Sequence, residues 1–365
     1  MSDKWKLLQV EGWGSYVLKE KFKLIKVSLK EWHASHSCNL HAKISNLKAR
    51  QAELDDKGEI NEMLAADCEE LHDVSVNIHS LSMLNTSICW QQARNQWLSE
   101  GDANSKFFHS SMSFRRRHNA ICFVLVNGVL VEGVEPVRYV VFSHFAHHFK
   151  AQNVARSSVS NLHFCSLSLT EGGGLIKLFF VDEVKAAVWD CDSFKSLGPN
   201  GVNFGFIKEF WLELKDDVMR FVSEFYRNGK LAKGINTTFI VLIPKVDNPQ
   251  RLNDFRLISL VGSMYKILAK LLANRLRLVV SSVISMTQSA FIKNRQILDG
   301  ILIANEVVDE ASKLKKELML FKVDFEKAST PLSGVIWTRL WSICLFRSSG
   351  GNGLENVLVL LQLLF

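Results

Sequence analysis

The chain has 365 residues, of which 47% are hydrophobic and 22% are charged, and its 44 basic residues exceed its 37 acidic residues for a formal net charge of +7. This length suffices for about two domains, and the apolar content excludes a wholly disordered chain. The seven cysteines are odd in number and widely spaced, and none forms a Cys-x-x-Cys pair. A disulfide framework and a zinc finger are therefore both excluded.

The N-terminal stretch MSDKWKLLQVEGWGSYVLKEK interrupts every apolar run with charged residues, so it does not predict a signal peptide. Nowhere does an unbroken apolar run approach the roughly 18 residues that a membrane-spanning helix needs. We therefore expect a soluble intracellular protein, nuclear or cytoplasmic and not secreted, that has no membrane partner.

Residues 1–150 are predicted to form a mainly helical region that contains one β-hairpin. Residues 1–100 hold few helix-breaking residues, and their apolar side chains recur at helical spacing, which predicts a long helical arm. Residues 120–132 carry two β-branched apolar runs on either side of Asn127 and Gly128, a pattern typical of a hairpin. The Ser-rich residues 151–175, with three consecutive glycines at 172–174, are expected to be a flexible linker.

Residues 176–328 alternate between helical and strand-like segments. Helices are predicted at 181–192 and 204–225, with a turn at 195–201 between them. The run TFIVLI at 238–243 predicts a buried strand, and residues 254–260 predict a second short strand. A basic amphipathic helix follows at 264–280, then a helix that ends at residue 311 and a second buried strand at 318–324. This order points to an α/β or α+β architecture, of which we expect α+β.

The positive charge is concentrated between residues 227 and 277, where ten basic residues meet two acidic ones for a net charge of +8. Such a local field suits a polyanion such as nucleic acid, although a solvated face of ordinary helices carries similar charge. Helical spacing places Lys266, Lys270 and Arg277 on one face of the predicted basic helix, opposite its apolar residues. These three residues are candidate nucleic-acid contacts.

A second basic cluster consists of Arg115, Arg116 and Arg117, which follow the aromatic pair Phe107 and Phe108. Aromatic rings beside cations suit single-stranded nucleic acid, whereas a phenylalanine pair at a helix end also fits a core. Two other patterns do not indicate sites. His144, His147 and His148 have metal-ligand spacing but no adjoining Cys or acidic partner, and the glycine run lacks the context of a phosphate-binding loop.

Asp324 closes the predicted strand at 318–324, a position where polymerases hold catalytic Mg²⁺. Two Mg²⁺ ions need at least two or three converging carboxylates, because Mg²⁺ prefers hard oxygen ligands. A single aspartate therefore does not define a metal site, and on its own it is better explained as a strand-end cap.

Several motifs in a fixed order resemble the reverse transcriptase region of plant non-LTR (LINE-type) retrotransposons. They are WLSEGDANSKFFH, KSLGPNG, NFGFIKEFW, FIVLIPKVDNP, NDFRLISLVGSMYKILAKLLANRL, SAFIKNRQILDGILIANEVVD and FKVDFEKA. The resemblance covers roughly residues 85–328 and does not rest on composition. It implies a helical linker followed by a partial right-hand polymerase domain, with the fingers and the first palm strand in residues 176–328.

The resemblance also implies roles for particular residues. Lys245 matches the lysine of the IPK motif and Arg256 the arginine of the FRPISL motif, so both would approach the incoming deoxynucleoside triphosphate or the template. Asp324 matches the first catalytic aspartate and would hold Mg²⁺, with the carbonyl of Phe325 as a second contact. The basic turn before the palm helix would contact the template through Lys293, Arg295 and Gln296. The implied partners are an RNA template, a DNA primer or target, and deoxynucleoside triphosphates.

The sequence departs from the family after residue 328. Ser329 and Thr330 stand where the family has Tyr-Asp, and the Asp-Asp turn that carries the other catalytic carboxylates is absent before the last residue. Leu257, Leu197 and Asn200 replace proline, proline and aspartate. We interpret residues 329–365 as a degenerate tail; a frameshift is our hypothesis for its origin, and an error in the gene model is the alternative.

We therefore expect a catalytically incomplete reverse transcriptase that has no polymerase activity alone. Two rivals stay open: a binding module that uses the basic fingers without catalysis, and a chain that folds poorly because its palm sheet is unfinished. The sequence leaves the oligomeric state and the template open.

Overall fold

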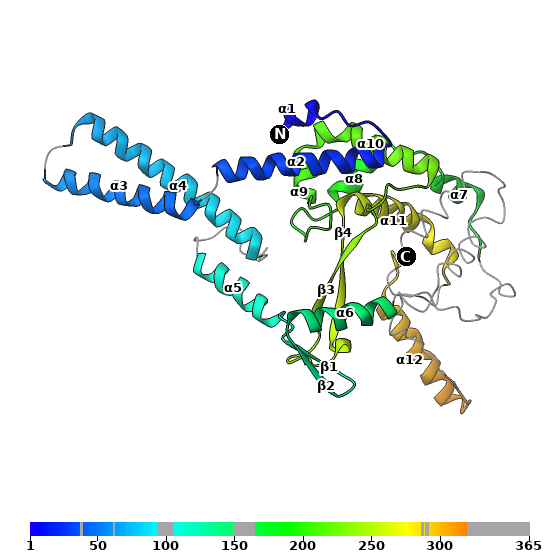
Figure 1. Cartoon of the computed structure of the whole chain (residues 1–365). Helices are drawn as coiled ribbons and strands as arrows, with labels where there is room; N and C mark the ends of the chain where they lie inside the picture. Colours follow the sequence, from blue (N-terminus) through cyan, green and yellow to red (C-terminus); the bar gives the residue numbers. More distant parts are fainter. Residues whose placement is uncertain are drawn as a thin grey trace. The chain divides into compact units, whose positions relative to one another are not determined.

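The computed structural model describes residues 1–36, 39–60, 63–93, 105–148, 165–285, 288 and 292–319 (Figure 1). It divides into two compact units. Unit 1 comprises Met1–Lys23, Asn153–Thr238 and Val261–Phe365, and unit 2 comprises Leu24–Gln152 and Phe239–Leu260. Both units combine segments that are distant in sequence, so this division differs from the sequential boundaries expected at residues 150 and 175. The described residues form helices and two small two-stranded sheets, a mixed composition that agrees with the expected α+β class.

Unit 1 is mainly helical. Its elements are α1 (Ser2–Leu7), the start of α2 (Gly14–His36), α7 (Leu169–Leu175), α8 (Val181–Trp189), α9 (Phe204–Glu209), α10 (Trp211–Asn228), α11 (Ser263–Val283) and α12 (Ile297–Lys313). The strongest amphipathic pattern belongs to α10, on which six apolar residues recur at helical spacing and are buried: Trp211, Leu214, Val218, Phe221, Val222 and Phe225. The helix predicted at 204–225 is therefore two helices, divided at Phe210.

The N-terminal residues are tied to α10 by a buried tryptophan. Trp5 is only 2% exposed, and its indole N–H donates to the carboxylate of Asp217 at 3.0 Å. Lys21 Nζ donates to the same carboxylate oxygen at 2.8 Å, and the Trp5 and Phe22 rings lie 5.6 Å apart. Because an indole N–H needs a partner when it is buried, Asp217 explains how this ring enters the core.

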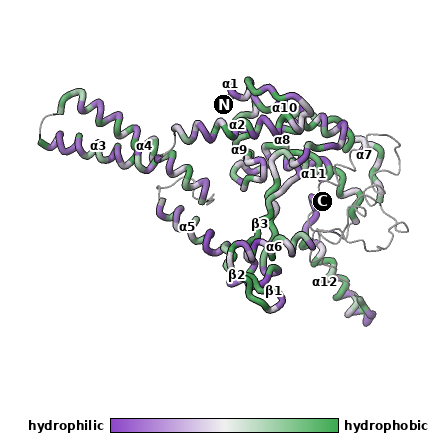
Figure 2. Tube along the Cα trace, viewed as in Figure 1, coloured by the Kyte–Doolittle hydropathy of each residue, from purple (hydrophilic) through white to green (hydrophobic). Residues whose placement is uncertain are grey.

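In unit 2, α3 (Leu40–Ile60) and α4 (Ala65–Ala93) are helical, as the spacing of apolar residues predicts, and they pack side by side (Figure 1). The Arg50 guanidinium holds the Glu70 carboxylate with two hydrogen bonds of 2.8 and 3.0 Å. Figure 2 shows hydrophilic and hydrophobic residues interleaved along both helices. Helix α5 (Ser105–His118) packs on α4 through Cys89, Ala93 and Phe108.

The expected hairpin is confirmed as β1 (Phe123–Val126) and β2 (Val129–Glu132), which pair antiparallel. Asn127 and Gly128 have φ values of 50° and 82°, which match the type I′ turn that Asn-Gly favours. Helix α6 (Val134–His148) packs on β2, and Val124, Val137 and Leu252 form a small core.

Strands β3 (Thr238–Pro244) and β4 (Phe255–Val261) form the second sheet, a two-stranded ribbon. The prediction that residues 238–243 are a buried strand is wrong, because most of this strand is exposed and the Phe239 side chain is 56% exposed. The tip of the ribbon is anchored, since Leu125 N donates to Gln250 O at 2.7 Å. A run of β-branched apolar residues indicates a strand, but it does not indicate whether other elements pack on the faces of that strand and bury them.

Two further predictions differ from the structure. Residues 169–175 of the expected linker form α7, because Ser168 and Glu171 build a capping box that starts a helix despite the glycines. Leu318 and Met319, at the start of the strand expected at 318–324, are exposed and belong to no strand. The rest of that segment, and residues 151–164 of the linker, lie outside the described residues. Among the described residues, no helix is both long and apolar enough to cross a membrane.

Candidate nucleic-acid interface

Helix α11 has two faces, as its spacing predicts. Met264, Ile267, Leu268 and Leu271 are among its buried residues, and the helix packs against α7 and α8. The side chains of Lys266, Lys270 and Arg277, which we call the basic face of α11, are at least partly exposed. One side of α11 thus anchors the helix in unit 1 while the other carries cations.

Lysines from α9 and α11 gather near the C-terminal end of α8. Lys270 Nζ is 3.5 Å from the carboxylate of Asp190. Lys208, on α9, donates from Nζ to the carbonyls of Trp189 at 3.1 Å and Cys191 at 2.7 Å. Burial raises the pKa of the Cys191 thiol, and the positive charges of Lys270, Lys208 and Lys266 partly offset this rise. These three lysines therefore place positive charge at the C-terminal end of α8, where the helix dipole already favours cations.

Lys208 was not among the candidate residues that the sequence indicated. It lies within the motif NFGFIKEFW, but the spacing of that motif does not indicate that Lys208 lies near Lys266 and Lys270 of another helix. Only the packing of α8, α9 and α11 brings the three together.

Arg275 and Arg277 have opposite surroundings although they are two residues apart. Arg277 is exposed, and Arg275 is 8% exposed. The Arg275 guanidinium bonds to both carboxylate oxygens of Glu183, at 2.6 and 2.8 Å. It also donates to three backbone carbonyls in residues 175–178 and lies over the Phe179 ring at 3.9 Å from the centroid. Arg275 is therefore a structural residue, and counting it in the +8 surface overstated the charge that is free to meet a polyanion.

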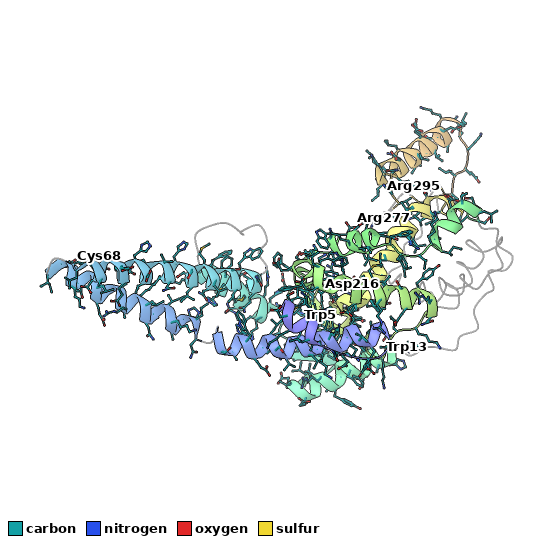
Figure 3. All side chains as sticks on the ribbon, turned by 90° about the horizontal axis from the view of Figure 1, so that it is seen from above. Trp5, Trp13, Cys68, Asp216, Arg277 and Arg295 are labelled. Carbon is teal, nitrogen blue, oxygen red and sulfur yellow. The ribbon has the colours of Figure 1, made fainter. Side chains whose placement is uncertain are left out.

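The three residues expected in the basic turn before the palm helix have three different environments. Arg295 donates to the carbonyls of Ser281, Ile284, Ser285 and Gln288, and so caps the C-terminus of α11 (Figure 3). The Gln296 side chain caps α12 in a box with Asp299. Lys293 is exposed, which leaves its ammonium group accessible to a phosphate.

The cluster of three arginines ends α5 in unit 2. Arg115 donates to the carbonyl of Ala93, whereas Arg116 and Arg117 are exposed. Phe108 is buried in the core, and Phe107 is 40% exposed. Of the two alternatives for this aromatic pair, Phe108 fits the hydrophobic core, whereas Phe107 lies on the surface, where a nucleic-acid base could stack.

Lys245 and Arg256 belong to the ribbon of unit 2 and are both exposed. Lys245 directly follows β3, and its Nζ donates to the carbonyl of Asn253 at 2.8 Å. Arg256 lies on β4 and, among the described residues, has no hydrogen bond or ion pair. A free guanidinium of this kind suits a phosphate.

The turn that joins these strands is held by Asp254. Its carboxylate accepts from the backbone N–H of Arg251 at 2.8 Å and of Gln250 at 3.0 Å, and these bonds hold the pKa of Asp254 below its usual range. The carboxylate thus stabilises the fold fully only above its unfolded pKa of about 3.9. As the pH falls through the lower folded pKa, this stabilisation is lost.

We expect Asp254→Asn to be less stable than the native chain at pH 7 and to approach the stability of the native chain near pH 2. Denaturant unfolding at each pH measures this difference in stability. A difference that stays constant with pH would contradict the role of the Asp254 carboxylate.

The loop at residues 195–201 docks onto the first turn of α11. Asn200 Oδ1 accepts from Ser263 N at 3.3 Å, and Asn200 Nδ2 donates to Ser263 Oγ at 2.6 Å. Gly198 lies so close to the chain that an added Cβ would be 2.4 Å from the backbone of Val261 and Gly262. The motif KSLGPNG therefore fixes the start of the helix that carries the basic face.

The predicted metal site is not part of this geometry. Asp324 and Phe325 lie outside the described residues, and the residues that the structure describes contain no group of three or more His, Cys, Asp or Glu side chains that could hold a metal ion. An Asp-Asp pair does occur at Asp216 and Asp217 on α10, but Asp217 is bound to Trp5 and Lys21. The described residues thus do not provide the converging carboxylates that a catalytic magnesium site needs.

Comparison with known proteins agrees with the ordered motifs. Residues 243–329 match the family described as reverse transcriptase (RNA-dependent DNA polymerase). The matched segment runs from the end of β3 through α11 and α12, so it includes Lys245, Arg256 and the basic face of α11. The chain thus contains reverse transcriptase sequence.

A transposon protein is similar to most of the chain. Over 307 residues the chain is 24% identical to the transposon TX1 uncharacterized 149 kDa protein of Xenopus laevis. The alignment covers 83% of this chain and 23% of that protein, so the chain spans about a quarter of the length of the curated relative it matches. The expectation of a retrotransposon reverse transcriptase sequence is confirmed, and the alternative of a non-catalytic nucleic-acid-binding module that uses the basic fingers is not favoured.

Proposed function

We propose that the chain is the linker, the fingers and the first part of the palm of a LINE-type reverse transcriptase of plant origin. The observation that carries this proposal is that the reverse transcriptase match at 243–329 coincides with the ribbon and helix that display Lys245, Arg256 and the basic face of α11. In this assignment these cations bind the phosphates of an RNA template, a DNA primer or target, or an incoming deoxynucleoside triphosphate.

The geometry supports nucleic-acid binding without a bound metal. Arg256, Arg277 and Lys293 are exposed, and Lys208, Lys266 and Lys270 raise the positive potential at the end of α8. Phosphate contacts of this kind position a nucleic acid and carry no sequence information, so binding would be nonspecific and sensitive to salt.

Divalent metal ions supply the Lewis acid chemistry of reverse transcriptases, and Asp324 is the residue that we assign to a metal here. No aspartate follows Asp324 in the sequence, so the second catalytic carboxylates of the family are missing from these 365 residues. One carboxylate does not hold two Mg²⁺ ions.

We therefore predict that the purified chain does not extend a primer. A primer–template duplex with deoxynucleoside triphosphates and Mg²⁺ or Mn²⁺ should give no product above a blank without enzyme. Template-dependent incorporation that Asp324→Ala abolishes would contradict the prediction and would show that the carboxylates present are sufficient. The same samples should retain the duplex in a gel-shift assay at low salt, which separates lost chemistry from lost binding.

A further inference from the structure

A hollow of about 590 Å³ on the surface of unit 1 has no role in the function proposed above. Glu11, Gly12, Trp13 and Tyr16 line one side of it, and Lys230 and its two following residues line the other. This volume lies within the range of small-molecule sites, and the hollow is open to solvent.

Two aromatic rings are exposed at this hollow. Trp13 is 54% exposed and Tyr16 is 45% exposed, although buried aromatic rings such as Trp5 and Phe22 lie in the same N-terminal segment. Gly12 has a φ of 130°, and an added Cβ there would lie 3.1 Å from the Tyr16 ring. The backbone at Gly12 therefore lies against the Tyr16 side chain, which a residue larger than glycine would displace.

The main chain around these rings is fixed from two sides. Arg220 donates to Gly12 O at 2.6 Å, and Gly14 N donates to the Glu224 carboxylate. On the far side of the hollow, Ala232 N donates to Ser15 Oγ at 3.2 Å. Because both segments are held, the main chain that carries the exposed rings does not have to be ordered when a ligand binds.

The charge beside the rings is positive. Lys230 lines the hollow, and Lys233 is exposed three residues further on. Lys19 adds a third cation and is tied to the same segment by a 2.8 Å bond from its Nζ to Lys233 O. Glu11 is the one acidic residue among those that line the hollow. Exposed aromatic rings next to several cations suit single-stranded nucleic acid, because its bases can stack on the rings and its anionic phosphates can bind the cations.

We propose that Trp13, Tyr16 and Lys230 form a binding site for single-stranded nucleic acid, with a base stacked on the aromatic surface and the adjoining phosphate on the lysines. This site rests on the proposed function for the nature of its ligand, but it uses none of the residues of the basic face of α11. It gives the chain a second contact with the unpaired part of a template or target strand.

The test uses the full chain and a fluorescein-labelled oligo(dT) of about 12 nucleotides, followed by fluorescence anisotropy at low salt. Trp13→Ala combined with Tyr16→Ala should weaken binding by about five-fold or more, since stacking on one aromatic side chain contributes at least that much. Trp13→Phe should stay within about two-fold of the native chain, because it keeps a ring for stacking. Trp32→Ala is the matched control, as it removes another exposed tryptophan from α2.

The possible results separate this site from the proposed function. Native affinity in the double alanine variant, together with weaker binding by Lys266→Ala and Arg277→Ala, would overturn the aromatic site and leave the basic face intact. Binding of a proline-rich peptide in place of the oligonucleotide would also overturn it. Photocrosslinking of 5-bromouracil-substituted oligo(dT) to Trp13 or Tyr16 would support the aromatic site. Thermal unfolding of each variant checks that the substitutions at exposed positions leave the fold intact.

Discussion

Arg275→Ala is expected to destabilise unit 1 by about 3 kcal/mol, because removing one partner of a buried ion pair leaves the other groups unpaired. The guanidinium of Arg275 satisfies Glu183 and the carbonyls of Leu175, Lys177 and Leu178. Leu175 ends α7, and Lys177 and Leu178 lie between α7 and α8, so these carbonyls have no partner within a helix or strand and lose their donor in the variant. Arg275→Lys should recover only part of the loss, since one ammonium group does not reproduce the fork of the guanidinium.

Arg277→Ala is the matched control for Arg275→Ala. Arg277 is exposed, so we expect its removal to change the unfolding free energy by no more than about 0.5 kcal/mol. Denaturant unfolding followed by circular dichroism measures both variants. Equal stabilities would show that the Arg275 network contributes nothing, and a large loss in Arg277→Ala would place that side chain in the core.

Gly198→Ala is expected to destabilise the chain by about 1–3 kcal/mol through overpacking. The added methyl group would lie 2.4 Å from backbone atoms of Val261 and Gly262, and backbone does not move aside as a flexible side chain does. The loop at 195–201 must then lift from α11, which also breaks the two hydrogen bonds between Asn200 and Ser263.

Gly173→Ala supplies the comparison for Gly198→Ala. A Cβ at Gly173 meets nothing within 4 Å, and the residue lies within α7. Alanine is the better helix former, so this variant should be more stable by about 0.5–1 kcal/mol. Thermal unfolding of both variants decides the matter, and a Gly198→Ala variant as stable as the native chain would mean that the loop does not rest on α11.

Local signals in the sequence predicted several elements of the fold. The hairpin at 120–132 follows from its Asn-Gly turn, and the buried and basic faces of α11 follow from residue spacing. Such features depend on neighbours within a few residues. They were therefore accessible without any knowledge of tertiary packing.

What the sequence did not predict depends on distant partners. Charge counting treated Arg275 and Arg277 alike, because the burial of Arg275 comes from Glu183, 92 residues away. The exposure of the β3–β4 ribbon and the packing of Trp5 against Asp217 are likewise set by distant segments. The catalytic assignment of Asp324 and the frameshift hypothesis concern residues outside the described part of the chain and stay predictions.

Binding of nucleic acid by the basic face of α11 should weaken as the salt concentration rises. Affinity of the full chain for single-stranded RNA would be measured from about 50 to 200 mM salt for the native chain and for a double variant, Lys266→Ala with Arg277→Ala. Lys4→Ala with Lys6→Ala removes the same charge from exposed positions on α1 and serves as the control.

We expect the α11 variant to bind more weakly and its slope of log affinity against log salt to fall by about 0.7 for each lost phosphate contact, while the control keeps the native slope. Equal affinity and slope in the native chain and the α11 variant would contradict it.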